Sequence, residues 1–162
     1  MATMVQAAQI AGIQPALLRM WFKRGVIVAG TSDRRAAEPG DSSDLSPHAV
    51  LAIAITAALA RAHLPLDRAA KAATLFAHTN SGRPRRRHPG ALYRAPGPAI
   101  QTLIVVPVEA RPVIMPSTAI TDLLVHIQSP GATIIAIDDV VDHVEAELAT
   151  ITGANSRPRR PA

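Results

Sequence analysis

The carboxyl-terminal half of the chain holds the acidic and histidine side chains whose spacing is most typical of catalysis. Asp138 and Asp139 follow a short apolar run, at the kind of strand end where α/β proteins hold metals or substrates. His143 lies four residues after Asp139, so an acid and an imidazole would share one face of a helix. The same aspartates also suit the start of a helix, as a cap and as partners of its dipole. We interpret them in this second, structural sense.

Other patterns of site chemistry are absent from the sequence. The chain has no cysteine, which excludes disulfides, thiolate metal sites and cysteine nucleophiles. It also has no glycine-rich phosphate loop, no Ser-His-Asp order and no metal-ligand spacing, and His126 stands alone. Aromatic residues make up 2% of the chain, which argues against a platform for stacking unpaired bases. We therefore expect no enzyme activity, no cofactor and no metal.

Basic side chains near the amino terminus suggest a different chemistry, the binding of a polyanion. Thr3 and Gln6 have the spacing of a capping box, and Pro15 suits the first position of a helix, so we predict helices over Val5–Ala11 and Pro15–Arg24. Two helices joined by a short turn, the second of them basic, can set a row of side chains in the major groove of DNA. A helical hairpin with a solvated basic face would show the same spacing.

The order of residues from Ala8 to Ile27 favours DNA binding over that alternative. The run reads A-x-x-A-G-I-x-P-x-x-L-R-x-W-x-K-R-G-V-I. It resembles the start of the MerR family of bacterial transcription regulators, in the branch with a tryptophan after the Leu-Arg pair. In that family this region is a winged helix-turn-helix whose second helix enters the major groove. Phe22 is a departure, because the family usually has an acidic residue there.

The resemblance implies which side chains would lie at the DNA. Arg19 and Lys23 would position the second helix by phosphate contacts, Gln14 and Ala16 would lie near the floor of the groove, and Trp21 would belong to the core. The residues expected to bind DNA are Gln14, Ala16, Arg19, Lys23, Arg24, Arg34 and Arg35.

The last two of these residues lie in the expected wing. Val26–Val28 is predicted as its first strand, and Ala29–Asp44 corresponds to the hairpin that lies over the DNA backbone in MerR-like proteins. Arg34 and Arg35 would meet phosphates there as bidentate donors. The family's aromatic Gly-Tyr-Arg element is missing, and a disordered polar loop is the alternative interpretation.

Two more helices are predicted behind this region. Ser46 as a cap and Pro47 at the first position begin one that ends near His63, and Leu66–Ala77 forms the other. Their pattern resembles the helix pair that braces the helix-turn-helix in MerR proteins. The basic side chains of this pair that we expect to be solvated are Arg61, Arg68 and Lys71.

The second half of the chain is predicted to be a small ββαβα unit. Two β-runs occur between Ile100 and Met115, followed by a helix at Thr118–Gln128, a buried strand at Ala132–Asp138 and a helix at Val140–Ile151. The long dimerisation helix of MerR proteins has no counterpart here. We expect this unit to self-associate, its apolar runs supplying sheet edges, or to bind a small-molecule or protein effector.

Charge divides the chain at about the same place. Residues 1–90 hold 12 basic and 5 acidic side chains, whereas residues 91–153 hold 2 and 7, so only the first half suits a polyanion. The predicted fold is α+β, a four-helix winged helix-turn-helix followed by the ββαβα unit. Its predicted parts are a MerR-like DNA-binding domain at 1–79, a basic Pro/Gly/Arg linker at 80–97, a small acidic α/β domain at 98–153 and a disordered basic tail at 154–162.

These patterns predict a sequence-specific transcriptional regulator that binds double-stranded DNA as a homodimer. No signal peptide is visible, and the longest apolar stretch, Ala49–Ala60, is too short to span a bilayer, so we expect a cytoplasmic, nucleoid-associated protein without a membrane partner. Two alternatives stay open. One is an antitoxin or adaptor with autoregulatory DNA binding, and the other is a DNA-bending factor of phage or plasmid type.

Overall fold

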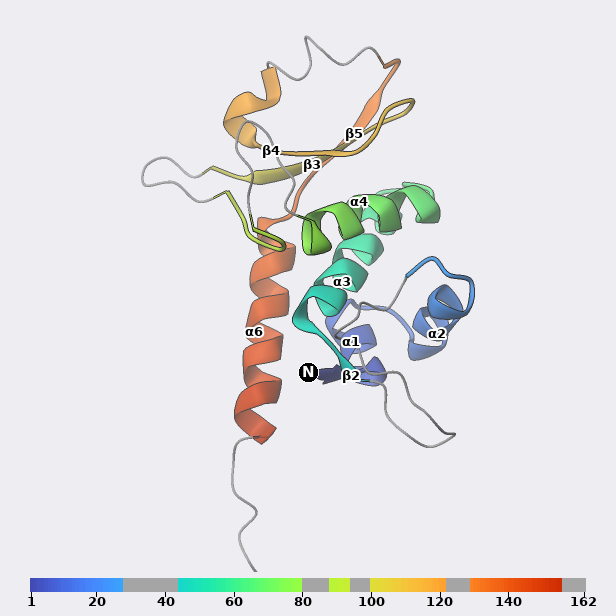
Figure 1. Cartoon of the computed structure of the whole chain (residues 1–162), viewed down its shortest axis with the longest axis vertical. Coiled ribbons are helices and arrows are strands. Elements are labelled where there is room, and N and C mark those ends of the chain that lie inside the picture. Colours follow the sequence, from blue (N-terminus) through green and yellow to red (C-terminus); the bar gives the residue numbers. More distant parts are fainter. Residues whose placement is uncertain (28–43, 80–87, 94–99, 122–128, 156–162) are drawn as a thin grey trace, which may run out of the picture.

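The protein combines a group of helices, a small sheet at one end of this group and a long helix along its side (Figure 1). The computed structural model describes residues 1–27, 44–79, 88–93, 100–121 and 129–155. Helices and strands both occur in these ranges, which confirms the predicted α+β class. None of the described helices has the combination of length and apolar composition that crossing a bilayer requires.

Helices α1 (Met4–Ile10) and α2 (Pro15–Lys23) form the predicted pair, each within one residue of its expected bounds. The capping box is present as predicted. The Thr3 hydroxyl accepts a hydrogen bond from the Gln6 N–H at 3.3 Å, and Gln6 Oε1 accepts one from the Thr3 N–H at 2.8 Å. Two of the free N–H groups of α1 are thereby satisfied within the same turn, which sets the first residue of the helix.

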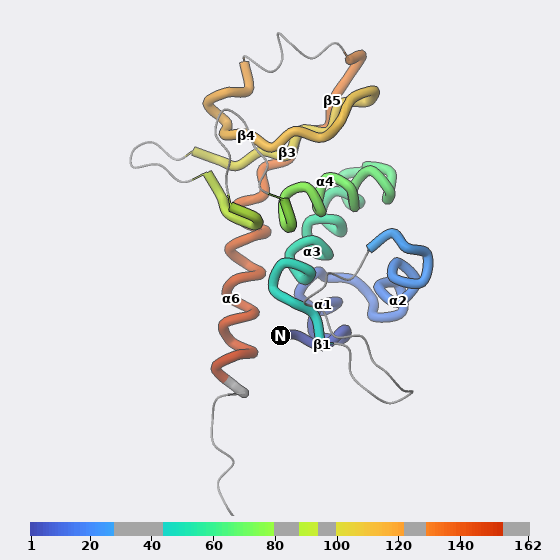
Figure 2. The backbone as a smooth tube through the Cα atoms, in the orientation of Figure 1, coloured from blue at the N-terminus to red at the C-terminus, as the bar shows by residue number. Residues whose placement is uncertain are grey.

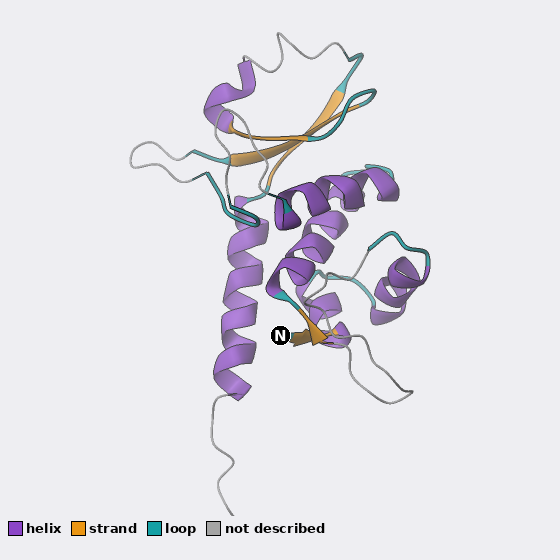
Figure 3. Ribbon diagram, viewed as in Figure 1, coloured by secondary structure: helices purple, strands orange, loops and turns teal. Residues whose placement is uncertain are grey.

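A short antiparallel pairing joins the amino terminus to the segment before the third helix. Strand β1 (Ala2–Thr3) lies beside β2 (Asp44–Leu45), with Ala2 opposite Leu45, and Figure 3 shows the two strands apart from the larger sheet. The sequence patterns did not predict this pairing. Both Ala2 and Leu45 are buried, so the pairing also closes one side of the helical core.

The predicted first wing strand at Val26–Val28 is wrong for its described residues. Val26 and Ile27 form bends rather than a strand, and residue 28 lies outside the described part of the chain. The reason lies at the end of α2, where Gly25 adopts a φ of +69° and the Val26 N–H donates to the Trp21 carbonyl at 2.9 Å. This arrangement closes the helix end and turns the chain inward, so that Ile27 is buried.

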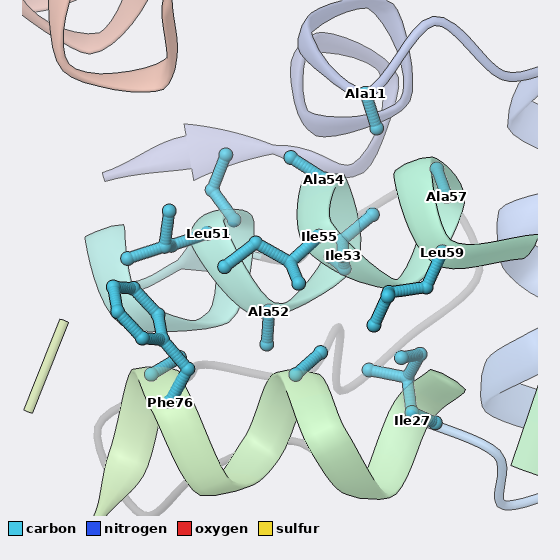
Figure 4. Packing of buried hydrophobic residues seen from close by; sticks show 14 of the residues in the cluster. Ala11, Ile27, Leu51, Ala52, Ile53, Ala54, Ile55, Ala57, Leu59 and Phe76 are labelled. Carbon is cyan, nitrogen blue, oxygen red and sulfur yellow. The ribbon is translucent and has the colours of Figure 1, made fainter. Parts of the chain in front are cut away.

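Helices α3 (Pro47–Arg61) and α4 (Leu66–His78) form the centre of the helical group. The predicted serine cap is confirmed, because the Ser46 hydroxyl accepts from the Ala49 N–H at 3.2 Å. Figure 4 shows apolar side chains of α3 packed against α4, with Phe76 of α4 beside the first turns of α3. Alanines make up most of the buried face of α4, so the two helices approach closely.

The larger sheet has three antiparallel strands in the order β4-β3-β5, and their bounds are Val113–Pro116, Thr102–Pro107 and Ala132–Ala136. Ile104, Val106 and Ile114 face the helices and belong to the main core. Alternate residues, among them Leu103 and Val105, face the other way and form a second, smaller cluster. The side chain of Arg68 connects α4 to this sheet by donating to the Pro107 carbonyl, so the expectation that Arg68 is solvated is wrong.

One prediction for this region needs correction. The strand β5 was expected to be buried, yet it lies at the edge of the sheet, and Ile134 is 39% exposed. Its apolar run is explained by alternation, because Ile135 packs toward the main core and Ile137, just after the strand, is fully buried. The helix expected at Thr118–Gln128 is not contradicted, because a 3₁₀ turn at Ser117–Ala119 leads into helical residues 120 and 121, and residues 122–128 lie outside the described part of the chain.

Helix α6 (Asp138–Asn155) is longer than predicted and leaves the sheet instead of covering it. It runs beside α3 and α1, as the tube in Figure 2 shows, and buries Val141 and Val144 in the main core. The described residues before and after the predicted linker at 80–97 therefore share one core. Three short strands and one helix have too little apolar surface for a large core of their own, which accounts for this sharing. The predicted domain boundaries stay predictions.

Removing the Phe76 ring should test how far the core depends on the contact between α3 and α4. Phe76 is fully buried, so Phe76→Ala should lower the free energy of unfolding by about 3–5 kcal/mol through lost burial and a residual cavity. Urea denaturation followed by circular dichroism measures the change. Thr74→Ala, at an exposed position of the same helix, is the control and should stay within about 0.5 kcal/mol of the wild type. An equal effect of both substitutions would contradict this packing.

Candidate nucleic-acid interface

Helix α2 presents one buried apolar face and one exposed polar face. Leu18 is fully buried and Trp21 is 3% exposed, which confirms the prediction that the tryptophan belongs to the core. Phe22 is half-buried and packs against the same core. The spacing of these residues leaves the opposite face free for solvent. The residues predicted to bind DNA that lie on α2 or at its ends are all exposed, namely Gln14, Ala16, Arg19, Lys23 and Arg24.

The exposed face of α2 is short, contiguous and positively charged. Ala16, Arg19 and Lys23 follow one another at intervals of three and four residues, which places them on one side of a helix. Residues 1–27 contain three basic side chains and no acidic one, so no acid in this segment offsets their charge. A row of this kind can contact a surface that carries regularly spaced negative charges.

The position of α2 in the molecule keeps this row away from the acidic part of the chain. Figure 1 shows α2 on one side of α1 and α3, and α6 on the other. Helix α6 carries four exposed acidic side chains, namely Asp139, Asp142, Glu145 and Glu147. The charge division in the sequence thus becomes a division between two sides of the fold.

The turn between α1 and α2 is built like the end of α2. Gly12 has a φ of +64°, its N–H donates to the Gln9 carbonyl at 3.0 Å, and the Ile13 N–H donates to the Ala8 carbonyl at 3.0 Å. A glycine in the left-handed conformation and this bond pattern end both helices of the pair. The turn is therefore held by its own backbone, which sets the angle at which α2 leaves α1.

Two long-range donors hold the carboxyl end of α1. Arg61 Nη1, from the end of α3, donates to the Ala11 carbonyl at 3.2 Å. His143 Nε2, from α6, lies 3.2 Å from the Ile10 carbonyl oxygen. The last carbonyls of a helix have no partner within the helix, so these contacts satisfy them and attach α1 to α3 and α6. Arg61 and Lys71 are both exposed, as expected, and Arg61 makes this contact to the Ala11 carbonyl in addition.

Two of the residues considered for catalysis, Asp138 and His143, make hydrogen-bond contacts that join distant parts of the fold. A helix cap is the residue just before the helix, and Asp138 is the first residue of α6, so Asp138 is not the cap. Its Oδ2 accepts a hydrogen bond from the Thr102 N–H at 2.8 Å. Asp139 and His143 line the same small hollow beside Arg61, as their spacing predicted. Within the described ranges, no three acidic or histidine side chains are grouped so that they could hold a metal ion.

Three residues considered in the sequence analysis, two of them predicted to bind DNA, lie outside the described residues. Arg34 and Arg35 of the expected wing fall in residues 28–43, and His126 falls in residues 122–128. Sequence patterns also missed the roles of Arg61 and His143 at the end of α1. A basic residue near the end of a helix is a general signal for a carbonyl partner, but it does not say which helix supplies the carbonyl.

Comparison with models of known protein families gives no match to this chain, and comparison with curated proteins gives none either.

The link between Asp138 and the sheet can be tested by two substitutions. Asp138→Ala should lower the free energy of unfolding by about 1–3 kcal/mol, because the N–H of the fully buried Thr102 would lose its acceptor. Asp138→Asn keeps an acceptor oxygen and should cost clearly less. Urea denaturation of both variants measures the difference. If the two variants were equally destabilised, the negative charge at the start of α6 would matter more than the hydrogen bond.

Proposed function

We propose that this protein is a sequence-specific regulator of transcription that binds double-stranded DNA with α2 in the major groove. The observation that carries the proposal is the amphipathic character of α2, whose basic face is exposed while Leu18 and Trp21 anchor the other face in the core. The resemblance of Ala8–Ile27 to the start of MerR-family regulators supports the same use of this helix. A buried anchor behind an exposed polar row is what a helix inserted into a groove needs.

The individual residues suit different parts of such an interface. Ala16 is small and exposed in the first turn of α2, so the helix can approach base edges closely there. Gln14 precedes the helix, and its amide can pair with a base edge, most favourably with adenine. Arg19 and Lys23 lie farther along the same face, where their longer side chains would reach the phosphates on either side of the groove.

The scaffold supports a fixed presentation of α2. Its start is held by the turn at Gly12, its end is closed at Gly25, and α1 is attached to α3 and α6 through Arg61 and His143. A recognition helix gains specificity when its angle to the DNA does not vary, because side chains must meet particular base edges. The exposed acids of α6 would keep the opposite side of the protein off the phosphates.

Arg19→Ala should weaken DNA binding by roughly 1–3 kcal/mol if its guanidinium contacts the DNA. The measurement is fluorescence anisotropy with duplexes selected by the wild-type protein from a random pool. Lys71→Ala is the matched control, because it removes one positive charge from the exposed face of α4 and should leave the affinity nearly unchanged. If Arg19→Ala binds as tightly as the wild type, α2 is not the recognition helix.

Lys23→Ala should act on the salt dependence more than on the sequence preference. A lysine that meets a phosphate releases counterions, so its loss should reduce the slope of log affinity against log salt by about 1 and weaken selected and unrelated duplexes alike. Titrations at several salt concentrations measure the slope. A change in sequence preference without a change in slope would place Lys23 at a base instead of a phosphate.

A further inference from the structure

The strand β5 has an open edge that carries none of the usual features that prevent pairing. Within the described parts of the chain, β3 lies on one side of β5 and no strand lies on the other. The strand reads ATIIA, with no charge, no proline and no bulge, and Ile134 is 39% exposed. Exposed edge strands are ordinarily protected by lysines, prolines or bulges, because their free N–H and C=O groups accept another strand.

The other edge of the sheet differs in this respect. Strand β4 is only four residues long, Pro116 ends it and Pro112 precedes it. Proline has no N–H to donate, so a strand bounded by two prolines is a poor partner for a further strand. The contrast between the two edges indicates that β5 is the one left available for pairing.

The backbone of β5 shows which of its groups point outward. The Ile137 N–H donates to the Thr102 carbonyl at 3.1 Å and the Val108 N–H donates to the Gly131 carbonyl at 2.9 Å, so odd-numbered residues of this segment bond with β3. In an antiparallel ladder the bonding direction alternates along a strand. The outward N–H and C=O groups therefore belong to Ala132, Ile134 and Ala136.

We propose that two copies of this chain pair through β5 in an antiparallel manner, with Ile134 of one copy opposite Ile134 of the other. This register matches each outward-pointing residue with another, because Ala132 then lies opposite Ala136 of the second copy. Each such pair exchanges two backbone hydrogen bonds, and the two sheets join into one continuous sheet. The twofold axis passes beside Ile134, so the same surface serves both copies.

Charge and shape allow this pairing. In this register Asp138 of one copy lies opposite Pro130 of the other, so the acidic start of α6 does not face its own counterpart. All paired residues of β5 are uncharged, and the small side chains of Ala132 and Ala136 flank the central isoleucines. Like charges opposite each other would destabilise a ladder, and none are present here.

The pairing leaves the proposed DNA-binding face free. Figure 1 shows the sheet at one end of the molecule, with α3 and α4 between it and the α1–β1–β2 region. The strand β5 is separate from α2, so a pair of chains would carry two exposed recognition helices. The pairing itself needs no DNA, and its test does not depend on the proposed function.

The test uses the position of the twofold axis. Ile134→Lys places two lysines opposite each other, and Ile134→Glu places two glutamates opposite each other, so each variant alone should raise the dimer dissociation constant by roughly tenfold or more. Mixing the two variants should restore the dimer, because lysine then lies opposite glutamate. Sedimentation velocity of the full chain over a range of concentrations measures all four samples, the wild type included.

Val108→Lys is the matched control, since Val108 is 54% exposed but lies at the end of β3, away from the new ladder. It should leave the dimer intact, and circular dichroism should show every variant folded. A wild-type chain that stays monomeric overturns the proposal. The edge of β5 would then be available only for a strand of another protein. Dimers that persist in both Ile134 variants, or a mixture that stays monomeric, overturn it as well. Arg19→Ala should lose DNA affinity without losing the dimer, which separates the two proposals.

Discussion

The burial of α3 is the constraint on which the rest of this structure depends. Ten of its fifteen residues are buried, and its one buried hydroxyl, that of Thr56, is satisfied within the helix by the Ala52 carbonyl at 2.7 Å. A helix that is apolar on nearly every side must be covered on nearly every side. The helices α1, α4 and α6 supply this cover, and they come from both ends of the chain.

This constraint explains why the two halves of the chain are joined. Helix α6 contributes Val141 and Val144 to the cover of α3, and the inner face of the sheet extends the same core. His143 then lies where it can meet the free carbonyl of Ile10 at the end of α1. The helix that precedes the candidate recognition helix is thus attached to the carboxyl-terminal half. A displacement of α6 would also shift the α1–α2 pair, because rigid packed elements transmit strain.

The features that the sequence predicted well depend on near neighbours in the chain. The capping box at Thr3, the cap at Ser46 and the proline at the start of α2 involve groups within three residues of each other, so their partners can be read directly from the order of residues. The two faces of α2 follow from helical periodicity for the same reason. The candidate site was therefore predictable as far as α2 and its ends, including the burial of Trp21.

The sequence by itself determined the helices α1 to α4, their ends and the amphipathic character of α2, because local backbone bonds and a period of 3.6 residues decide these. Only the tertiary structure decided the pairing of Ala2 with Leu45, the acceptors of Arg61 and Arg68, and the place of β5 at an edge. Many carbonyls and strands in the chain could satisfy such donors and edges equally well. The choice among them depends on which distant segments the cover of α3 brings together, and no local pattern contains that information.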